Sequence, residues 1–286
     1  MSVVKNFKMF ENENIVKSNQ YILGVPSGEI IEINSKILLK LIDENLINYH
    51  DVYMCYYFKD KYYKNVKRII SEFNDTEIDK YQKDYIEFNL DKFEIKNYII
   101  NDDLSVDVRG DVDISGRNLI KIPIKFNIID GDFDCSNNKL TNLVNSPRTI
   151  NGIFNCSKNN IYTLIGGPNF IKTEYDCSDN LLEELDGYPI ICPNIFDCSN
   201  NQINTLKHLP KILDVVFFDV SYNRLKNLTG PVKTKNFDCS NNNITTLVNG
   251  ITECDGTFNC NYNKLYNLLG APKAKILIYE RGNNYK

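Results

Sequence analysis

The sequence is poor in histidine, with only His50 and His208 among its 286 residues. Because histidine is the usual proton-transfer residue and a frequent zinc ligand, few candidates exist for either chemistry. No apolar run approaches the ~20 residues that a membrane-spanning helix needs. Residues 1–20 also lack the apolar core of a secretory signal. We therefore expect a cytoplasmic chain that does not bind membranes.

The net charge is low as well, since 33 basic residues stand against 37 acidic ones, a formal charge of -4. A field this weak does not attract the whole molecule to nucleic acid, so we expect no nucleic-acid partner. The composition, 42% hydrophobic and 24% charged, is that of a folded protein, and the length fits two domains. Nine cysteines in a chain of this size, without a secretory signal, do not indicate a disulfide framework.

The cysteines mark a structural repeat instead. They recur at an interval of 21 residues from Cys135 to Cys198, and the interval resumes between Cys239 and Cys260. Alignment on this slot gives nine coils, in which the slot holds Ile114, Cys135, Cys156, Cys177, Cys198, Val220, Cys239, Cys260 and Glu280. Because isoleucine and valine replace cysteine here, we interpret the cysteines as buried core residues.

Other positions keep the same register. The residue two places before the slot is apolar and mostly aromatic, so that both side chains face one side of a strand: Val112, Phe133, Phe154, Tyr175, Phe196, Phe218, Phe237, Phe258 and Ile278. Leucine or isoleucine recurs five and eight places after the slot and completes the predicted core. Asparagine recurs three places after it, where stacked copies can satisfy the backbone as the chain leaves each strand. Glycine and proline, as in Gly166 and Pro168, then predict an extended return.

The repeat unit F-x-C-S-x-N-x-L-x-x-L-x-G-x-P resembles the short leucine-rich repeats of bacterial and tailed-phage proteins, as in NFDCSNNNITTL at residues 236–247. The resemblance covers residues 106–286. It implies a leucine-rich repeat solenoid, a parallel β-sheet of about nine coils with extended or turn returns. The family shares a scaffold more than an activity. The function that the resemblance implies is accordingly a general one, that of a phage-encoded protein that binds a bacterial host protein in the host cytoplasm.

A polar stripe is predicted on the exposed face of the sheet. The residue before the core slot is Asp or Asn in eight coils, the residue after it is mostly Ser, and nothing about the core requires Asp there. One interpretation is that duplication copied a tolerated polar residue along the array. The other is a binding face for a protein partner with a basic or amide-rich surface. The binding residues so predicted are Asp134, Asp176, Asp197, Asp219, Asp238, Ser157, Ser178 and Ser199.

The first two coils are rich in aspartate. Asp111 and Asp113 stack under Asp132 and Asp134, with Asp130 close in sequence, and carboxylates are the ligands that Ca²⁺ and Mg²⁺ prefer. Alternate residues of a strand project outward instead of wrapping an ion, which favours an ordinary solvated acidic edge. We therefore expect no bound metal and no cofactor.

Residues 1–105 lack the repeat and predict a separate small helical or α+β domain. The segment from Tyr21 to Ile33 is typical of two strands around a turn. Three helices are expected, one after Ser35, one over residues 62–73 and one after Asp75.

Two patterns in this domain suggest chemistry. His50 and Cys55 are close in sequence, as a cysteine nucleophile and its base can be, but neither lies in a known catalytic signature. Lysine and tyrosine alternate over residues 59–64, a pattern that can bind single-stranded nucleic acid, but the domain is negatively charged. We expect no catalytic residues.

The sequence therefore predicts a non-catalytic protein-interaction module. Two alternatives stay open: an effector or toxin whose N-terminal domain is an enzyme targeted by the repeats, and a structural or adhesive component. The last strand, residues 274–280, is apolar, so two copies could pair end to end. Because Glu280 and Arg281 protect this edge by charge, we expect a monomer.

Overall fold

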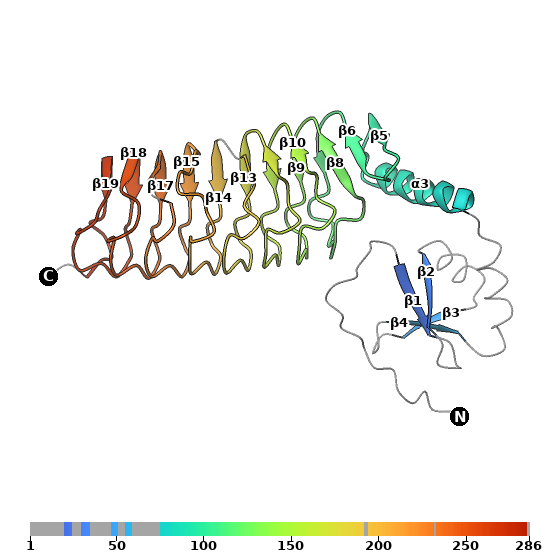
Figure 1. The fold of residues 1–286 in the computed structure, drawn as a ribbon, viewed down its shortest axis with the longest axis horizontal. Helices are drawn as coiled ribbons and strands as arrows, with labels where there is room; N and C mark the ends of the chain where they lie inside the picture. The colour runs from blue at the N-terminus through green and yellow to red at the C-terminus, as the bar shows by residue number, and fades with distance from the viewer. Residues whose placement is uncertain are drawn as a thin grey trace, which may run out of the picture. The chain divides into compact units, whose positions relative to one another are not determined.

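The computed structural model describes residues 20–24, 30–34, 47–50, 55–58 and 75–284, apart from residues 192, 193 and 232. Contacts between Cα atoms divide the chain into two units, Met1–Ile86 and Glu87–Lys286. Each unit is described by itself (Figure 1).

The first unit contains a four-stranded sheet with the order β2-β1-β4-β3. Its strands are β1 (Gln20–Gly24), β2 (Ile30–Asn34), β3 (Ile47–His50) and β4 (Cys55–Phe58). β1 and β2 pair in antiparallel fashion, which confirms the two strands predicted between residues 21 and 33. The helices predicted after Ser35 and over residues 62–73 lie outside the described residues.

The third predicted helix is present as α3 (Asp75–Lys92). Its C-terminal part belongs to the second unit, where Leu90 and the following Phe93 and Ile95 are buried. The guanidinium of Arg117 lies 5.9 Å from the centre of the Phe93 ring, so this segment packs on the first coil. Residues 87–105, which the sequence assigned to the N-terminal domain, thus pack with the repeats.

The second unit is a parallel β-solenoid, seen in Figure 1 as a row of strands from β6 to β19. One sheet, here called the main sheet, follows the predicted strands: β7 (Val112–Asp113), β9 (Phe133–Asp134), β11 (Phe154–Asn155), β13 (Glu174–Asp176), β14 (Ile195–Asp197), β15 (Phe217–Asp219), β17 (Asn236–Asp238), β18 (Glu253–Asn259) and β19 (Lys273–Ile278). Its strands pair in register, with Tyr175 opposite Phe196 and Phe196 opposite Phe218.

The returns form a second sheet, here called the return sheet, that the sequence did not predict as strands. It contains β5 (Tyr98–Ile100), β6 (Val106–Val108), β8 (Phe126–Ile129), β10 (Thr149–Ile150) and β12 (Phe170–Ile171). Single bridges at Ile191 and Ile212 continue it, and β16 (Lys233–Thr234) pairs with the start of β18. β10 and β12 have only two residues each, too few to show an alternation, so the sequence there indicates only an extended return.

The predicted core is confirmed in the first eight turns. The aromatic and cysteine slots are buried from Val112 and Ile114 to Phe258 and Cys260. Successive rings lie 5.1 to 5.9 Å apart, and those of Phe196 and Phe218 are stacked with an angle of 2° between them. Side chains so closely matched along the solenoid axis exclude water from the whole length of the core.

The asparagine ladder is also confirmed. Asn180 is representative: its Nδ2 donates to the carbonyl oxygens of Cys156, Cys177 and Ser178 at 3.0 to 3.2 Å, and its Oδ1 accepts the amide of Ile161 at 2.9 Å. The same pattern recurs at Asn138, Asn159, Asn201, Asn223, Asn242 and Asn263. Each side chain thus replaces the backbone pairing that is lost where the strand ends.

The last coil departs from the predicted register, so the solenoid has about eight complete turns instead of nine. β19 pairs Leu277, not Ile278, with Phe258. Three positions separate Ala274 from Leu277, whereas four separate their partners Cys254 and Phe258, so the corner of this coil is one residue shorter. Ile278 consequently points outward, with 38% of its surface exposed.

Candidate functional site

The strand register brings most of the predicted binding residues into one line on the outer face of the main sheet. On successive strands each residue of the line lies opposite the next, in the order Asp134, Asn155, Asp176, Asp197, Asp219, Asp238 and Asn259. Four aspartates are therefore consecutive, and we call Asp176, Asp197, Asp219 and Asp238 the acidic ladder. Parallel strands lie ~4.8 Å apart, so these carboxylates are close enough to repel one another.

Each aspartate has a structural contact that the sequence analysis missed. The Oδ1 atom of Asp176 accepts the backbone amide of Ser178 at 2.9 Å, and Asp197 and Asp219 accept those of Ser199 and Ser221 at 2.9 and 2.8 Å. This is the turn in which an Asp or Asn side chain caps the amide two residues later. The turn, and not the core, therefore requires a polar acceptor at these positions.

The predicted serines are less exposed than expected. Ser157 and Ser178 are buried, and their hydroxyls donate to Asn155 and Asp176 Oδ1 at 2.7 Å. Ser199 is half-buried. The strand ends at the aspartate, so the serine belongs to the turn and does not alternate outward as it would in a longer strand. The outer face is thus acidic, without the exposed hydroxyl stripe that was predicted.

The second carboxylate oxygens differ along the line. At its ends, Asn155 donates to Oδ2 of Asp134 at 3.4 Å and Asn259 donates to Oδ2 of Asp238 at 2.8 Å. For the three aspartates between them, Asp176, Asp197 and Asp219, Oδ1 accepts the backbone amide of the serine two residues later, and the hydroxyl of that serine also donates to the carboxylate. The ion pairs of the described residues involve carboxylates elsewhere.

The electrostatic consequence appears in the carboxyl groups at the centre of the ladder. Burial and, to a smaller extent, the carboxylates of Asp197 and Asp238 outweigh the hydrogen bonds from Ser221 and raise the pKa of Asp219 to about 6. Burial also raises the pKa of Asp197. At the exposed first coil the balance reverses, because hydrogen bonds from Ser115 lower the pKa of Asp113. The middle of the ladder therefore holds negative charge at a free-energy cost.

A second outward row lies beside the ladder and was not predicted. Its four members are half-buried, and each lies two positions before a residue of the acidic line, Asn155, Asp176, Asp197 or Asp219. They are Ile153, Glu174, Ile195 and Phe217. Burial, and then the charges of Asp176 and Asp197, raise the pKa of Glu174. The alternation that located the stripe also places this row outward, so the sequence contained the signal. The face therefore combines carboxylates with apolar contact area.

The aspartates of the first coils are used within the fold. Oδ1 of Asp111 accepts the amide of Asp132 at 2.9 Å, Oδ1 of Asp132 accepts that of Ile153 at 2.7 Å, and Asp130 accepts Nδ2 of Asn151 at 2.8 Å. Within residues 75–284 as described, no group of three or more His, Cys, Asp or Glu side chains is placed to hold a metal ion.

The cysteines of the core slot are buried and form no disulfide. Burial raises the pKa of the Cys198 and Cys239 thiols well above the usual value. Because the thiolate is the reactive form, these residues are inert core side chains. In the first unit, the β3–β4 register places His50 directly opposite Cys55 in the backbone.

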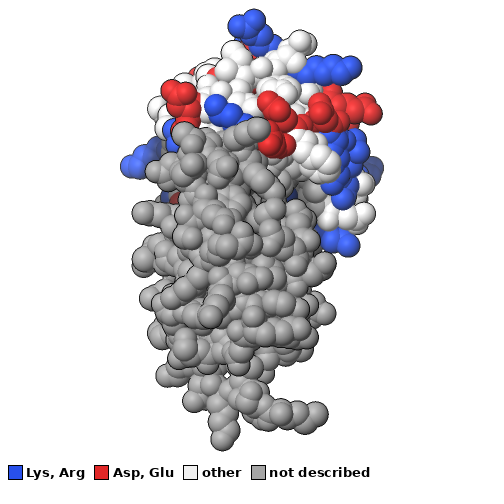
Figure 2. Space-filling model, turned by 90° about the vertical axis from the view of Figure 1, so that its right-hand side faces the viewer, with Lys and Arg blue, Asp and Glu red and all other residues white. Residues whose placement is uncertain are grey.

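Charge elsewhere is mixed. Figure 2 shows acidic and basic side chains intermingled on the described part of the face that it draws. Of the helices that the structure describes, none is both long and apolar enough to cross a membrane.

Comparison of the chain with protein-family models and with curated proteins found no match.

Proposed function

We propose that the chain is a non-catalytic protein-interaction module of the leucine-rich repeat type, which binds a basic or amide-rich protein surface through the outer face of the main sheet. The observation that supports this most is the set of carboxylate oxygens at Asp176, Asp197 and Asp219 that have no cationic partner among the described residues. A solenoid sheet of this kind offers an extended surface for a partner.

The turn geometry explains an acceptor at these positions but not a charge. Asn155 makes the same contact, accepting the amide of Ser157 through Oδ1 at 3.0 Å. A neutral side chain therefore suffices for folding. Aspartate in the middle of the ladder adds repulsion and desolvation, as the raised pKa of Asp219 indicates. A lysine, arginine or amide group of a partner would relieve both, because it would place a positive charge or a hydrogen-bond donor beside these carboxylates.

The row beside the ladder supports the same function. Ile195 and Phe217 are half-buried next to Asp197 and Asp219, so a bound partner would cover apolar as well as charged surface. Charge alone gives weak and salt-sensitive association, whereas a desolvated apolar contact beside it slows dissociation of the complex. The partner expected is a protein surface with basic or amide groups around an apolar centre.

The test replaces Asp176, Asp197 and Asp219 together by asparagine. This variant keeps each Oδ1 acceptor and removes three charges, so the fold should stay intact. Binding of a lysine- and glutamine-rich peptide, measured by titration calorimetry at low and moderate salt, should weaken at least about tenfold and lose most of its salt dependence.

The matched control changes three exposed carboxylates away from this face, Asp91→Asn, Glu183→Gln and Asp186→Asn, and removes the same net charge. It should retain the wild-type affinity. Equal weakening in both variants would show that only overall charge matters. Unchanged binding in the ladder variant would move recognition to the turns or to the first unit.

A second candidate function is an enzymatic first unit that the repeats target. It is favoured by one observation, the backbone register that pairs His50 with Cys55. A double substitution, His50→Ala with Cys55→Ala, tests it. If the variant folds but loses the activity of the intact protein in cells, while peptide binding by the repeats is unchanged, the enzyme hypothesis gains over the binding module.

A further inference from the structure

The outer face of the return sheet carries an apolar row that the fold does not use. Strand register aligns Ile128, Thr149 and Phe170, and a bridge continues the row to Ile191. Ile212 occupies the same position in the next turn, beside the buried Leu213. The residues that follow them inward, Ile129, Ile150 and Ile171, are buried in the core. We call Ile128, Thr149, Phe170, Ile191 and Ile212 the apolar stripe.

The stripe is open to solvent. Ile128 is 40% exposed, Ile191 48% and Ile212 65%, while Phe170 is half-buried. A single exposed isoleucine is ordinary on a protein surface, but a row in which four of five neighbouring positions are Ile or Phe is typical of an interaction site. Five positions at ~4.8 Å per strand make a line of about 19 Å.

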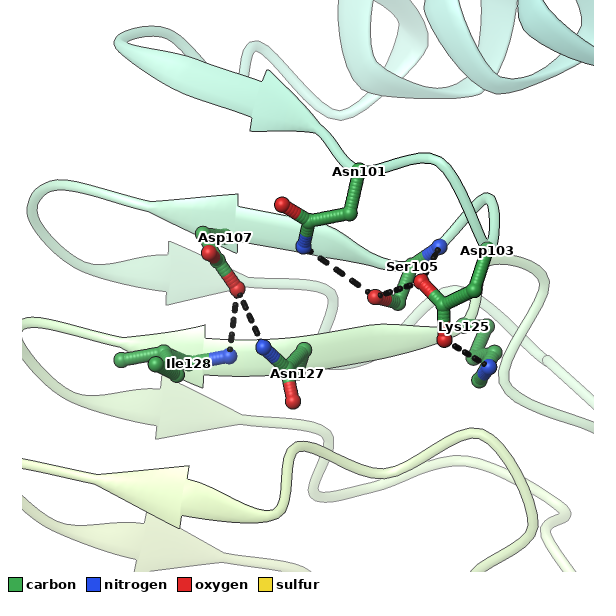
Figure 3. Close-up of polar contacts among 7 residues, drawn as sticks. All are labelled: Asn101, Asp103, Ser105, Asp107, Lys125, Asn127 and Ile128. Carbon is green, nitrogen blue, oxygen red and sulfur yellow. Dashed lines mark hydrogen bonds and ion pairs between the residues drawn. The ribbon is translucent and has the colours of Figure 1, made fainter.

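Charged residues define both ends of the stripe. Before Ile128 the row continues with Asp107, which accepts Nδ2 of Asn127 at 2.8 Å and the amide of Ile128 at 3.1 Å (Figure 3). After Ile212 it continues with Lys233, which pairs with Glu253 at 3.2 Å. The apolar surface is therefore a bounded patch over the middle coils and not a general feature of the returns.

Basic side chains flank the patch. Arg148 precedes Thr149, Lys172 follows Ile171 and points to the same side as Phe170, and Lys211 precedes Ile212; all three are exposed. No ion pair joins any of them to a described carboxylate. The middle of the stripe is thus flanked by unpaired basic side chains, whereas Asp107 and Asp130 lie toward its first end and Asp214 lies 4.0 Å from Lys235 near its last.

We propose that the apolar stripe is a docking surface for an acidic amphipathic helix of a partner protein. A helix laid across the strands presents one apolar residue per 5.4 Å turn, close to the ~4.8 Å interval of the stripe. Over the four intervals the mismatch accumulates to only about 2 Å, which leucine side chains can absorb. Glutamates beside the apolar seam would face Arg148, Lys172 and Lys211. Asp107, Asp130 and Asp214 border the same surface and would repel the continuous negative charge of an anionic membrane, whereas the glutamates of a helix can be placed away from them.

The probe is a synthetic helical peptide of about 15 residues, with leucine at positions i, i+4, i+7 and i+11 and glutamate on both flanks. Its binding to the full chain is measured by fluorescence anisotropy. A peptide with lysine in place of glutamate is the comparison, because it should avoid this surface and report on the acidic ladder instead. Vesicles of phosphatidylcholine and phosphatidylserine form the third arm.

The acidic peptide should bind, and the double variant Ile191→Glu with Ile212→Glu should lower its affinity at least about tenfold. Lys172→Glu with Lys211→Glu should weaken binding at low salt and less at high salt. Ile120→Glu, at a residue 71% exposed outside the stripe, should change it less than about twofold. Circular dichroism establishes that each variant is folded. The proposal is overturned if the acidic peptide fails to bind at about 1 mM, if the stripe variants bind it like wild type, or if vesicles bind and lose binding in the stripe variants.

Discussion

Replacement of Asn201 by alanine tests whether the asparagine ladder holds the turns together. The Nδ2 group of Asn201 donates to the carbonyls of Cys177, Cys198 and Ser199 at 3.1 to 3.2 Å. Its Oδ1 accepts the amide of Leu182 at 3.0 Å. Alanine removes all four hydrogen bonds from a buried site.

The expected loss of stability depends on which hydrogen bonds the former partners of Asn201 keep. The carbonyl of Cys177 keeps a donor in Asn180, and the carbonyl of Cys198 keeps one in Asn223. Only the amide of Leu182 loses its sole partner, which costs about 1–3 kcal/mol, and the three weakened carbonyls add a few tenths each. We expect a total loss of about 2–4 kcal/mol in the free energy of unfolding.

The assay is urea unfolding followed by circular dichroism, with Asn204→Ala as the control. Asn204 is an exposed asparagine three residues away, and its replacement should cost less than about 0.5 kcal/mol. Equal midpoints for Asn201→Ala and Asn204→Ala would refute the structural role of the ladder.

Asn201→Asp sharpens the test. Aspartate keeps the acceptor for Leu182 but turns its second oxygen toward three carbonyls, so its pKa should be raised in the folded state. A group with a raised folded pKa stabilises the protein below its unfolded pKa and loses that contribution as pH rises through the folded value. The variant should therefore approach wild-type stability near pH 4 and fall below it near pH 7.

Three further predictions follow from the core, the ladder and the last strand. Thiol titration in denaturant without reductant should return nearly all nine cysteines as free thiols, whereas the native protein should react slowly; several disulfides would contradict the core assignment. Because the pKa of Asp219 is raised to about 6, stability should decrease by about 1–3 kcal/mol as pH rises from 4 through 6, and Asp219→Asn should flatten this dependence; an unchanged profile would exclude the carboxylate as its cause. Light scattering at micromolar concentration should give a monomer mass; a dimer that reverts on Ile278→Pro would show pairing through β19.

The sequence predicted those parts of the fold in which the same position of every turn needs the same type of side chain. The slots of Phe196 and Cys198 need an apolar side chain in every turn, and Asn201 needs both a donor and an acceptor, so the residue type repeats and the period is visible. The acidic line was found for the same reason. Its turn contact was not, because an aspartate that caps the amide of Ser199 looks in sequence like any exposed polar residue.

The last coil shows where alignment by residue type fails and geometry decides. Sequence spacing placed Ile278 and Glu280 in the two core slots, but a glutamate at the core slot would be buried without a partner. One residue fewer at the corner shifts the strand, so that Leu277 pairs with Phe258 and the carbonyl of Tyr279 accepts Nδ2 of Asn283 at 3.0 Å. The shift exposes Glu280 and places Leu277 and Tyr279, both half-buried, at the two slots. A charged residue at a core position of an aligned repeat therefore indicates a one-residue deletion in the preceding turn. The alignment of that repeat should then be shifted so that the preceding residue occupies the core slot.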